Sequence, residues 1–289
     1  MQIYHSPLDL QVTAWKWRSQ GVNVGLVPTM GYLHQGHVSL MKHARDRANK
    51  VIVSLFVNPT QFGPNEDLSR YPRDFEHDVA VAEQAGVDVL FAPTPLDMYD
   101  DGSPVWVDVP DMALRLCGKT RPTHFRGVTT VVTKLLMLAM PQFAVFGEKD
   151  WQQLQILRRM VSALNIPVEL IGCPIVREAD GLALSSRNVN LAAEERRQAV
   201  NIYAGLTMAA TRVADGVTDV SQLVADVQAY YERSMSLGRI DYLEVFHPFT
   251  LQPLASITGP ARIAAAVFFE KARLIDNMAL NNDLLSDPA

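Results

Sequence analysis

The sequence predicts an α/β fold, with a Rossmann-like, doubly wound parallel sheet followed by a second, smaller α+β domain at the C-terminal end. Three observations support this prediction. Short apolar segments alternate with segments of helical period through the first 175 residues, and this alternation stops near residue 177. The total of 289 residues corresponds to two domains of roughly 150 residues each. We therefore expect a larger domain over 1–176 and a smaller one over 177–289.

Composition narrows the class of protein. Hydrophobic residues make up 48% and charged residues 20%, as in globular proteins, and the net charge is −5. Such a surface does not attract nucleic acids or anionic membranes, so a phosphate ligand needs a local site. The longest apolar run, 263–269, is too short to span a bilayer, and the first residues lack a secretory signal. Because Cys117 and Cys173 form no C-x-x-C pair, we expect a cytoplasmic protein without disulfides.

The first predicted βαβ unit covers residues 24–57. An apolar run, Val24–Val27, ends at Pro28 and predicts a strand. Apolar residues then recur at helical spacing over 37–50, and the β-branched run 51–57 is typical of a strand buried on both faces. Such a crossover is almost always right-handed.

The same alternation predicts the other elements of the larger domain. Helices are expected over 74–85, 128–140 and 151–164, and strands over 87–92, 143–146 and 168–176. In the smaller domain we expect helices over 192–214 and 220–235, strands over 240–246 and 262–269, and fraying after residue 277. A parallel sheet binds its ligands at the carboxyl ends of its strands, so we expect functional residues in the segments that follow the strands.

The segment between the first strand and its helix, 28–37, is the most informative. A helix N-terminus at a strand end offers free N–H groups and a positive dipole end to a phosphate. Gly31 and Gly36 allow close backbone approach, and His34 and His37 can both donate hydrogen bonds to phosphate oxygens. A metal site is the alternative, but H-E-x-x-H is absent and no third ligand is near in sequence. We therefore expect a phosphate site.

A second polar cluster, 56–63, follows the second strand. Asn58 and Gln61 are predicted to project at the same sheet edge as the histidines, where their amides can bind a small polar substrate without adding charge. Turn chemistry before Pro59 explains Asn58 equally well. It does not explain Gln61.

A third cluster, 146–153, also follows a strand and opens a helix. Asp150 and Gln153 have the spacing of a capping box, which leaves the role of Asp150 undecided. Lys149 has no such structural role. We expect it to neutralise charge on a triphosphate.

A fourth cluster, 180–188, lies at the predicted domain boundary. Ser185, Ser186 and Arg187 place two hydroxyls beside a guanidinium, which is a compact set of groups for binding an oxyanion. The same residues could cap the helix that follows. Taken alone, this segment leaves both interpretations open.

With these four clusters in this order, the chain resembles the pantothenate synthetase (pantoate–β-alanine ligase) family, part of the H-x-G-H nucleotidyltransferases that include the class I aminoacyl-tRNA synthetases. Residues 185–188 match the serine–arginine version of the synthetases' K-M-S-K-S loop. The resemblance runs from Leu26 to about Asn277. It includes three further motifs, at 71–73, 121–127 and 272–277.

The resemblance implies a two-step reaction. The carboxylate of (R)-pantoate attacks the α-phosphorus of ATP, which releases pyrophosphate and leaves a pantoyl adenylate. The amine of β-alanine then attacks the activated carbonyl and gives pantothenate and AMP. ATP is thus a co-substrate, Mg²⁺ accompanies its phosphates, and family members are usually homodimers. The larger domain would bind nucleotide and substrates, and the smaller one would act as a lid.

Site residues follow from the resemblance, position by position. Those implied in catalysis are His37, His34, Lys149 and Arg187. Those implied in ATP binding are Met30, Gly31, Tyr32, Leu33, His34, Gln35, Gly36, His37, Gly147, Glu148, Lys149, Asp150, Val176, Leu184, Ser185, Ser186 and Arg187. Those implied in binding pantoate and β-alanine are Gln61, Gln153 and Asn58. Asp78 is the implied protein contact of magnesium, while His77 stands at a position that is acidic in some relatives.

The chain departs from the family pattern in two further places. Thr60 stands where Met is usual, and Trp151 where Phe or Tyr is common.

Other functions remain as alternatives to this one. Another H-x-G-H enzyme making a dinucleotide or CDP product is disfavoured by the Gln61 and Gln153 clusters. The short, acidic chain disfavours a tRNA synthetase. A non-catalytic nucleotide-binding module should have lost phosphate-site residues, and a metal hydrolase lacks a ligand set.

Overall fold

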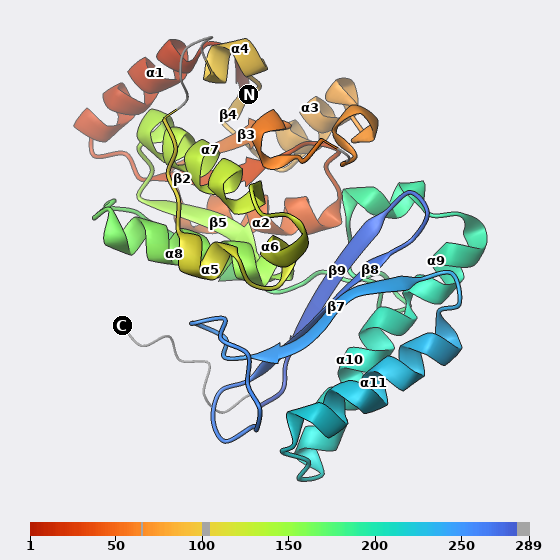
Figure 1. Cartoon of the computed structure of the whole chain (residues 1–289). Helices are drawn as coiled ribbons and strands as arrows, with labels where there is room; N and C mark the ends of the chain where they lie inside the picture. Colours follow the sequence, from red (N-terminus) through yellow and green to blue (C-terminus); the bar gives the residue numbers. More distant parts are fainter. Residues whose placement is uncertain (65, 100–104, 282–289) are drawn as a thin grey trace. The chain divides into compact units, whose positions relative to one another are not determined.

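The computed structural model describes residues 1–64, 66–99 and 105–281, and these form two compact units (Figure 1). No helix in these ranges combines the length and the apolar character that crossing a membrane requires. The larger unit comprises Met1–Ala113, Arg121–Glu148 and Gln153–Val176. The smaller unit comprises Leu114–Thr120, Lys149–Gln152 and the chain from Arg177 onward.

The larger unit is built on a six-stranded parallel sheet with the order β1-β4-β3-β2-β5-β6. The strands β3 and β4 lie on one side of β2, and β5 and β6 lie on the other. The order therefore reverses between β2 and β5, which is where such folds bind ligands. This topology confirms the predicted Rossmann-like sheet. The strands are β1 (Gln2–Tyr4), β2 (Val24–Thr29), β3 (Lys50–Leu55), β4 (Val89–Phe91), β5 (Phe143–Gly147) and β6 (Glu169–Cys173).

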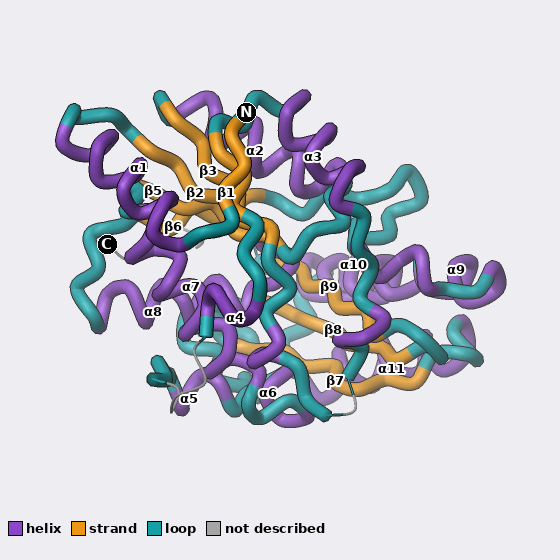
Figure 2. The backbone as a smooth tube through the Cα atoms, turned by 90° about the horizontal axis from the view of Figure 1, so that it is seen from above, coloured by secondary structure: helices purple, strands orange, loops and turns teal. Residues whose placement is uncertain are grey.

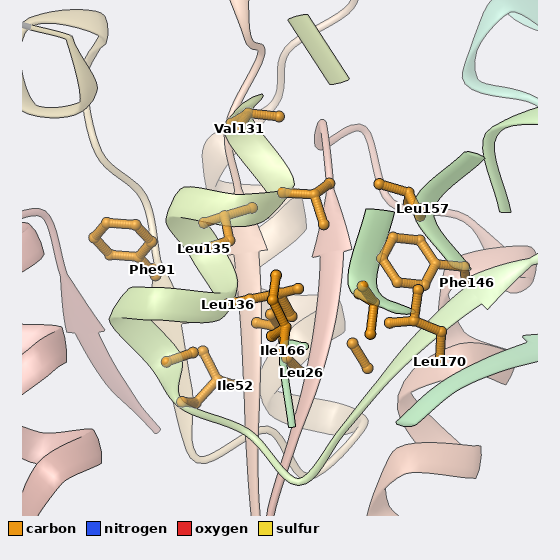
Figure 3. Close-up of a cluster of buried hydrophobic side chains, with 14 of the residues drawn as sticks. Leu26, Ile52, Phe91, Val131, Leu135, Leu136, Phe146, Leu157, Ile166 and Leu170 are labelled. Atoms are coloured by element: carbon orange, nitrogen blue, oxygen red, sulfur yellow. The ribbon is translucent and has the colours of Figure 1, made fainter. Parts of the chain in front are cut away.

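Helices cover both faces of this sheet, because side chains alternate along each strand and the buried strands are apolar on both faces (Figure 2). Leu26 and Ile52 belong to the core beneath α1 (Pro7–Ser19), α7 (His124–Ala139) and α8 (Trp151–Ala163) (Figure 3). Val27 and Val53 belong to the opposite core. That core lies beneath α2 (Gln35–Arg47) and α3 (Phe75–Gln84).

Short helical segments connect these elements. They contribute less to the free energy of unfolding than the two hydrophobic cores do. Each Leu or Val side chain that becomes fully buried in a core contributes about 1.5–3 kcal/mol. The segments are α4 (Pro95–Met98), α5 (Pro110–Ala113), α6 (Cys117–Thr120), and the 3₁₀ turns η1 (Pro59–Gln61), η2 (Leu68–Arg70), η3 (Glu148–Asp150) and η4 (Ser186–Asn190).

The smaller unit contains a three-stranded antiparallel sheet with the order β7-β8-β9. Its central strand is apolar over most of its length, and Ile263 and Val267 are fully buried together with Leu206 and Leu223 from two of the helices. The elements are α9 (Ala193–Ala199), α10 (Asn201–Ala214), α11 (Val220–Ser234), β7 (Arg239–Phe246), β8 (Arg262–Phe268) and β9 (Arg273–Ala279).

Pro28 lies inside β2, although the sequence predicts that it ends the strand. The carbonyl of Thr29 accepts a hydrogen bond from Phe56 N beyond β3, so the backbone of Pro28 faces the other side, toward β5. There the pairing ends at Leu26, which pairs with Ala144. A residue without an N–H is tolerated at this position because no ladder hydrogen bond is lost.

Other boundaries also differ from the predictions. Helix α7 begins at His124, four residues before the predicted start, and the single helix predicted over 192–214 is two helices that meet at Val200. The strands β1 and β9 and the helix α1 were not predicted. The expected fraying after Asn277 is wrong for the next two residues, since Met278 and Ala279 pair with β8. Residues 282–289 lie outside the described residues.

Candidate active site

The two histidines after β2 form the N-terminal cap of α2. His34 is the N-cap residue, and its Nδ1 accepts a hydrogen bond from Gly36 N at 3.1 Å. His37 Nδ1 accepts one from His34 N at 3.2 Å, which completes a capping box. Because Nδ1 is the acceptor in both rings, each neutral imidazole carries its proton on Nε2. The rings lie 4.1 Å apart between centroids and so supply neighbouring Nε2–H donors.

Asp78 on α3 holds the loop that precedes these histidines. Its side chain is buried, with Oδ2 accepting a hydrogen bond from Tyr32 N at 2.8 Å and Oδ1 accepting one from Leu33 N at 2.6 Å. Gly31 and Tyr32 both have positive φ, 85° and 51°. A Cβ at Gly31 would lie 3.0 Å from Asp78 Oδ2, so the loop requires glycine there.

Magnesium is the metal that the sequence implies at Asp78. Both carboxylate oxygens of Asp78 are engaged by backbone N–H groups, and His77 Nδ1 lies 3.5 Å from Oδ1. Within the described ranges, no group of three or more His, Cys, Asp or Glu side chains could hold a metal ion. The chain therefore offers no metal cage of its own here, and the magnesium contact stays a prediction.

The amides after β3 form one connected group. Asn58 Nδ2 donates hydrogen bonds to Gln61 Oε1 and Gly127 O, both at 3.1 Å, and Gln61 Nε2 contacts Met30 Sδ at 3.1 Å. Asn58 Oδ1 also accepts from Thr60 N and so caps η1. The turn interpretation of Asn58 is thus confirmed, and its side chain also orients Gln61, while contact of Asn58 with a substrate stays a prediction.

Three residues that contact this group were not among the predicted site residues. The Tyr99 hydroxyl donates to Asn58 Oδ1 at 2.8 Å, and burial raises the pKa of Tyr99 more than its hydrogen bonds lower it. The carbonyl of Gln61 contacts His124 Nδ1 at 2.8 Å and accepts from Arg121 at 3.4 Å. Arg121 and His124 belong to a motif that the family resemblance includes, which was the available signal. No such signal pointed to Tyr99, because it lies 41 positions from Asn58 and outside the motifs of the family.

The lysine cluster follows β5. Lys149 lies in η3 and is half-buried, and its carbonyl accepts a hydrogen bond from Asn277 Nδ2 at 3.0 Å. Asp150 is exposed at the end of η3, which leads directly into α8, where Gln153 is half-buried. Trp151 is buried and its Nε1 donates to Pro248 O at 2.7 Å, which gives the indole at this position a structural reason.

The serine–arginine segment forms the turn η4. The Ser185 hydroxyl accepts from Arg187 N at 3.3 Å and caps this turn, while Ser186 is buried. The hydroxyl of Ser185 thus caps η4 and not the helix α9 that follows. At the start of α9, the Glu195 carboxylate accepts from Ala192 N at 2.8 Å.

The predicted site residues are divided between the two units. Those in the larger unit follow the carboxyl ends of four strands, on both sides of the point where the strand order reverses. They are Met30–His37 after β2, Asn58 and Gln61 after β3, Gly147 and Glu148 at the end of β5, Gln153 on α8 and Val176 after β6. The exception is Asp78, which lies on α3 and holds the loop after β2. Those in the smaller unit are Lys149, Asp150 and Leu184–Arg187.

The chain is similar to known proteins over nearly its whole length. Residues 2–279 match the family model described as pantoate-beta-alanine ligase. The pantothenate synthetase of Oleidesulfovibrio alaskensis is 57% identical over 280 residues, covering 97% of this chain and 100% of that protein. The corresponding protein of Nitratidesulfovibrio vulgaris (strain Miyazaki F) is 55% identical, covering 97% and 99%.

Two solved structures agree with this similarity. The crystal structure of pantothenate synthetase from Thermus thermophilus is 45% identical, with a TM-score of 0.91 over 98% of this chain and 100% of that chain. The pantoate-beta-alanine ligase of Francisella tularensis, complexed with beta-gamma ATP and beta-alanine, is 34% identical, with a TM-score of 0.79 over 98% of both chains.

Proposed function

The chain belongs to the pantoate–beta-alanine ligase family, which condenses pantoate with β-alanine at the expense of ATP, and we propose that its reaction proceeds through a pantoyl adenylate. In the first step, a carboxylate oxygen of pantoate bonds to the α-phosphorus, and the bond from that phosphorus to the leaving pyrophosphate breaks. In the second, the β-alanine nitrogen bonds to the carbonyl carbon, loses a proton, and AMP leaves with the carboxyl oxygen.

The observation that carries this proposal is the paired Nε2–H donors of His34 and His37 at the N-terminus of α2. Charge moves onto the phosphate oxygens as pyrophosphate leaves. Donors that are already oriented stabilise this charge without reorganising. His37, which the family resemblance implies as a proton donor, has the tautomer needed to donate from Nε2.

Lys149, Ser185, Ser186 and Arg187 are proposed to bind the triphosphate and the departing pyrophosphate. A point-charge ammonium and a forked guanidinium, with two hydroxyls, are suited to that anion. Magnesium is proposed to arrive with ATP, since this ion is usually held by substrate phosphates and one or two carboxylates. Asp78 is the carboxylate proposed to contact it.

Gln61, Gln153 and Asn58 are proposed to bind pantoate and β-alanine. Support comes from the hydrogen bonds that fix Gln61 from three sides, namely its Oε1, its Nε2 and its backbone carbonyl. An amide held in this way recognises hydroxyl and carboxylate groups without introducing charge that would oppose carboxylate attack. No protein nucleophile is required, because positioning and charge stabilisation carry both steps.

Three further features are part of the proposal. Residues 1–176 are proposed to bind nucleotide and substrates, and residues 177–289 to act as a lid. The enzyme is proposed to work as a homodimer, as family members usually do. Its two cysteines, Cys117 and Cys173, are free and buried, which supports a cytoplasmic location.

The test is release of AMP and pyrophosphate from ATP and magnesium, with pantoate and β-alanine added singly and together. We expect sustained AMP release only when both are present. Pyrophosphate without AMP would indicate transfer of the nucleotide to another acceptor and would contradict the proposal. ATP binding without turnover would indicate a different acceptor acid or a non-catalytic module.

A further inference from the structure

We infer that Asn277, on β9, is a positioning residue for Lys149 and acts through the lysine backbone on the adenylate-forming step. This inference rests on the proposed role of Lys149 at the triphosphate. All the contacts that carry it lie within the smaller unit.

The amide of Asn277 has its orientation fixed by two partners of opposite kind. Its side chain is 3% exposed, Nδ2 donates to Lys149 O at 3.0 Å, and Oδ1 accepts from the Arg262 guanidinium. A guanidinium has only donors, and a carbonyl oxygen only accepts. The amide therefore fits in one orientation alone, with its donor toward Lys149.

Arg262 also contacts the lysine segment directly, through Trp151. It is 4% exposed on β8, and its guanidinium carbon lies 3.5 Å from the centroid of the Trp151 ring. Trp151 is two residues beyond Lys149 and is itself held by Pro248 O. A buried cation is stable only where it is partnered, so Arg262 constrains Asn277 and Trp151 together. The backbone of Lys149 is thus held both through its own carbonyl and through Trp151.

The residue before Asn277 holds the other phosphate-binding segment of this unit. Asp276 pairs with Arg177 at 2.6 and 3.0 Å, and Arg177 also donates to Gly181 O at 3.1 Å. Arg177 is bridged to Ala183, two residues before the serine–arginine segment that begins at Ser185. Successive side chains of a strand point to opposite sides. One dipeptide of β9 therefore contacts the lysine segment directly and supports the chain that leads into the serine–arginine segment through Arg177.

The effect of losing one of these hydrogen bonds should fall on chemistry more than on folding. A misplacement of about 1 Å in a catalytic group costs on the order of 100-fold in rate. Lys149 is proposed to act on the triphosphate, so its displacement slows formation of the adenylate. It does not affect attack of β-alanine on an adenylate that is already formed, since pyrophosphate has left by then.

The variant that tests this is Asn277→Asp, because a carboxylate keeps the bond with Arg262 but presents an acceptor to the carbonyl of Lys149. The matched control is Asn281→Asp. Asn281 likewise uses both ends of its amide, since Oδ1 accepts from Ala261 N at 3.0 Å and Nδ2 donates to Gly259 O at 2.6 Å, and neither of these hydrogen bonds involves the lysine segment. Both variants are compared with the native enzyme for thermal unfolding.

Each half-reaction is measured separately in a single turnover. We expect Asn277→Asp to slow pyrophosphate release from ATP, magnesium and pantoate by roughly 100-fold. Pantothenate release from supplied pantoyl adenylate and β-alanine should change less than about threefold, and Asn281→Asp should alter neither step. Equal slowing of both steps by Asn277→Asp, or equal slowing by the two variants, would overturn the inference. If Asn277→Asp does not fold, Asn277→Ala takes its place with the same expectations.

A double-mutant cycle shows whether the effect passes through the lysine. In a Lys149→Met background, Asn277→Asp should slow adenylate formation by less than about threefold, because the group it positions is gone. A full further loss of roughly 100-fold would contradict the inference. These outcomes are distinct from a failure of the proposed function, which is a native enzyme that makes no pantothenate.

Discussion

His34 and His37 use opposite nitrogens of their rings for folding and for chemistry. Nδ1 of each accepts a backbone N–H at the start of α2, and this fixes both the ring orientation and the tautomer. Nε2 is then the donor by necessity. The same histidine pair therefore caps the helix and supplies the donors for the phosphates, so the two functions can be separated only by a residue that caps without an imidazole.

Asn is such a residue at position 34. Its side-chain oxygen is among the best N-caps, whereas His34→Ala removes the cap and costs about 1 kcal/mol of stability. We expect His34→Asn to unfold at nearly the native denaturant concentration and His34→Ala at a lower one. Both should lose roughly 10²-fold or more in turnover, as expected for removal of an oriented donor. Urea unfolding with steady-state kinetics checks this, and native turnover in His34→Asn would count against the assignment.

Single residues also show what the sequence could and could not predict of the site. The histidines, Gln61 and Lys149 were predicted because each sits just past a strand and lacks a full structural explanation. Tyr99 was not predicted, and Asn277 appeared only as part of a family motif without a role, because their contacts are hydrogen bonds to segments 41 and 128 positions away. No local pattern encodes such a contact.

At the scale of elements, helix α7 and the turn η1 are packed together through one glycine. A Cβ on Gly127 would lie 2.5 Å from Thr60 O and 2.7 Å from Gln61 Cα. The carbonyl of Gly127 also accepts from Asn58. This close approach is what places the amides after β3.

Gly127→Ala should therefore push η1 away from α7. We expect a loss of about 1–3 kcal/mol in the free energy of unfolding, as for other overpacked sites. The KM for pantoate should rise more than the KM for ATP, since Gln61 moves with η1. Gly259→Ala is the control, because nothing lies within 4 Å of the added Cβ. An equal rise in both KM values would argue against the placement of pantoate at Gln61.

Elements were predictable where their apolar pattern is strong. The strands β2, β3 and β5 and the helices α2, α3, α8 and α11 were found because burial on one or both faces dictates their period. The strand β9 was missed since Arg273, Asp276 and Asn277 give it the polarity of a loop. Its polar side chains are instead buried against partners such as Arg177 and Arg262, which only the folded unit brings together.

On the scale of the whole molecule, neither unit is a continuous stretch of chain. The smaller unit takes in residues 114–120 and 149–152 as well as the chain from Arg177. The sequence predicted the fold class and the end of the strand–helix alternation near residue 177. It could not predict these two excursions, because they are short and are defined by tertiary contacts alone.

Removal of magnesium should abolish the activity of the enzyme without changing the stability of its fold. In the described part of the chain no cluster of side chains could hold a metal ion by itself, so the fold should not depend on one. With excess EDTA we expect pyrophosphate release to stop and the Tm of the ligand-free enzyme to stay unchanged. Differential scanning calorimetry beside the activity assay checks both. A lowered Tm would indicate a structural metal.

The long separation in sequence between Lys149 and β9 has a consequence for synthesis on the ribosome. Lys149 is made 128 residues before the asparagine that holds its carbonyl. At roughly 5–20 residues per second, this is an interval of about 6–26 seconds. During it, the six strands of the larger sheet have all emerged, but the lysine segment lacks its support from β9. A nascent or prematurely terminated chain is therefore expected to acquire the sheet without competent adenylate chemistry, so that consumption of ATP begins only after β9 has been made.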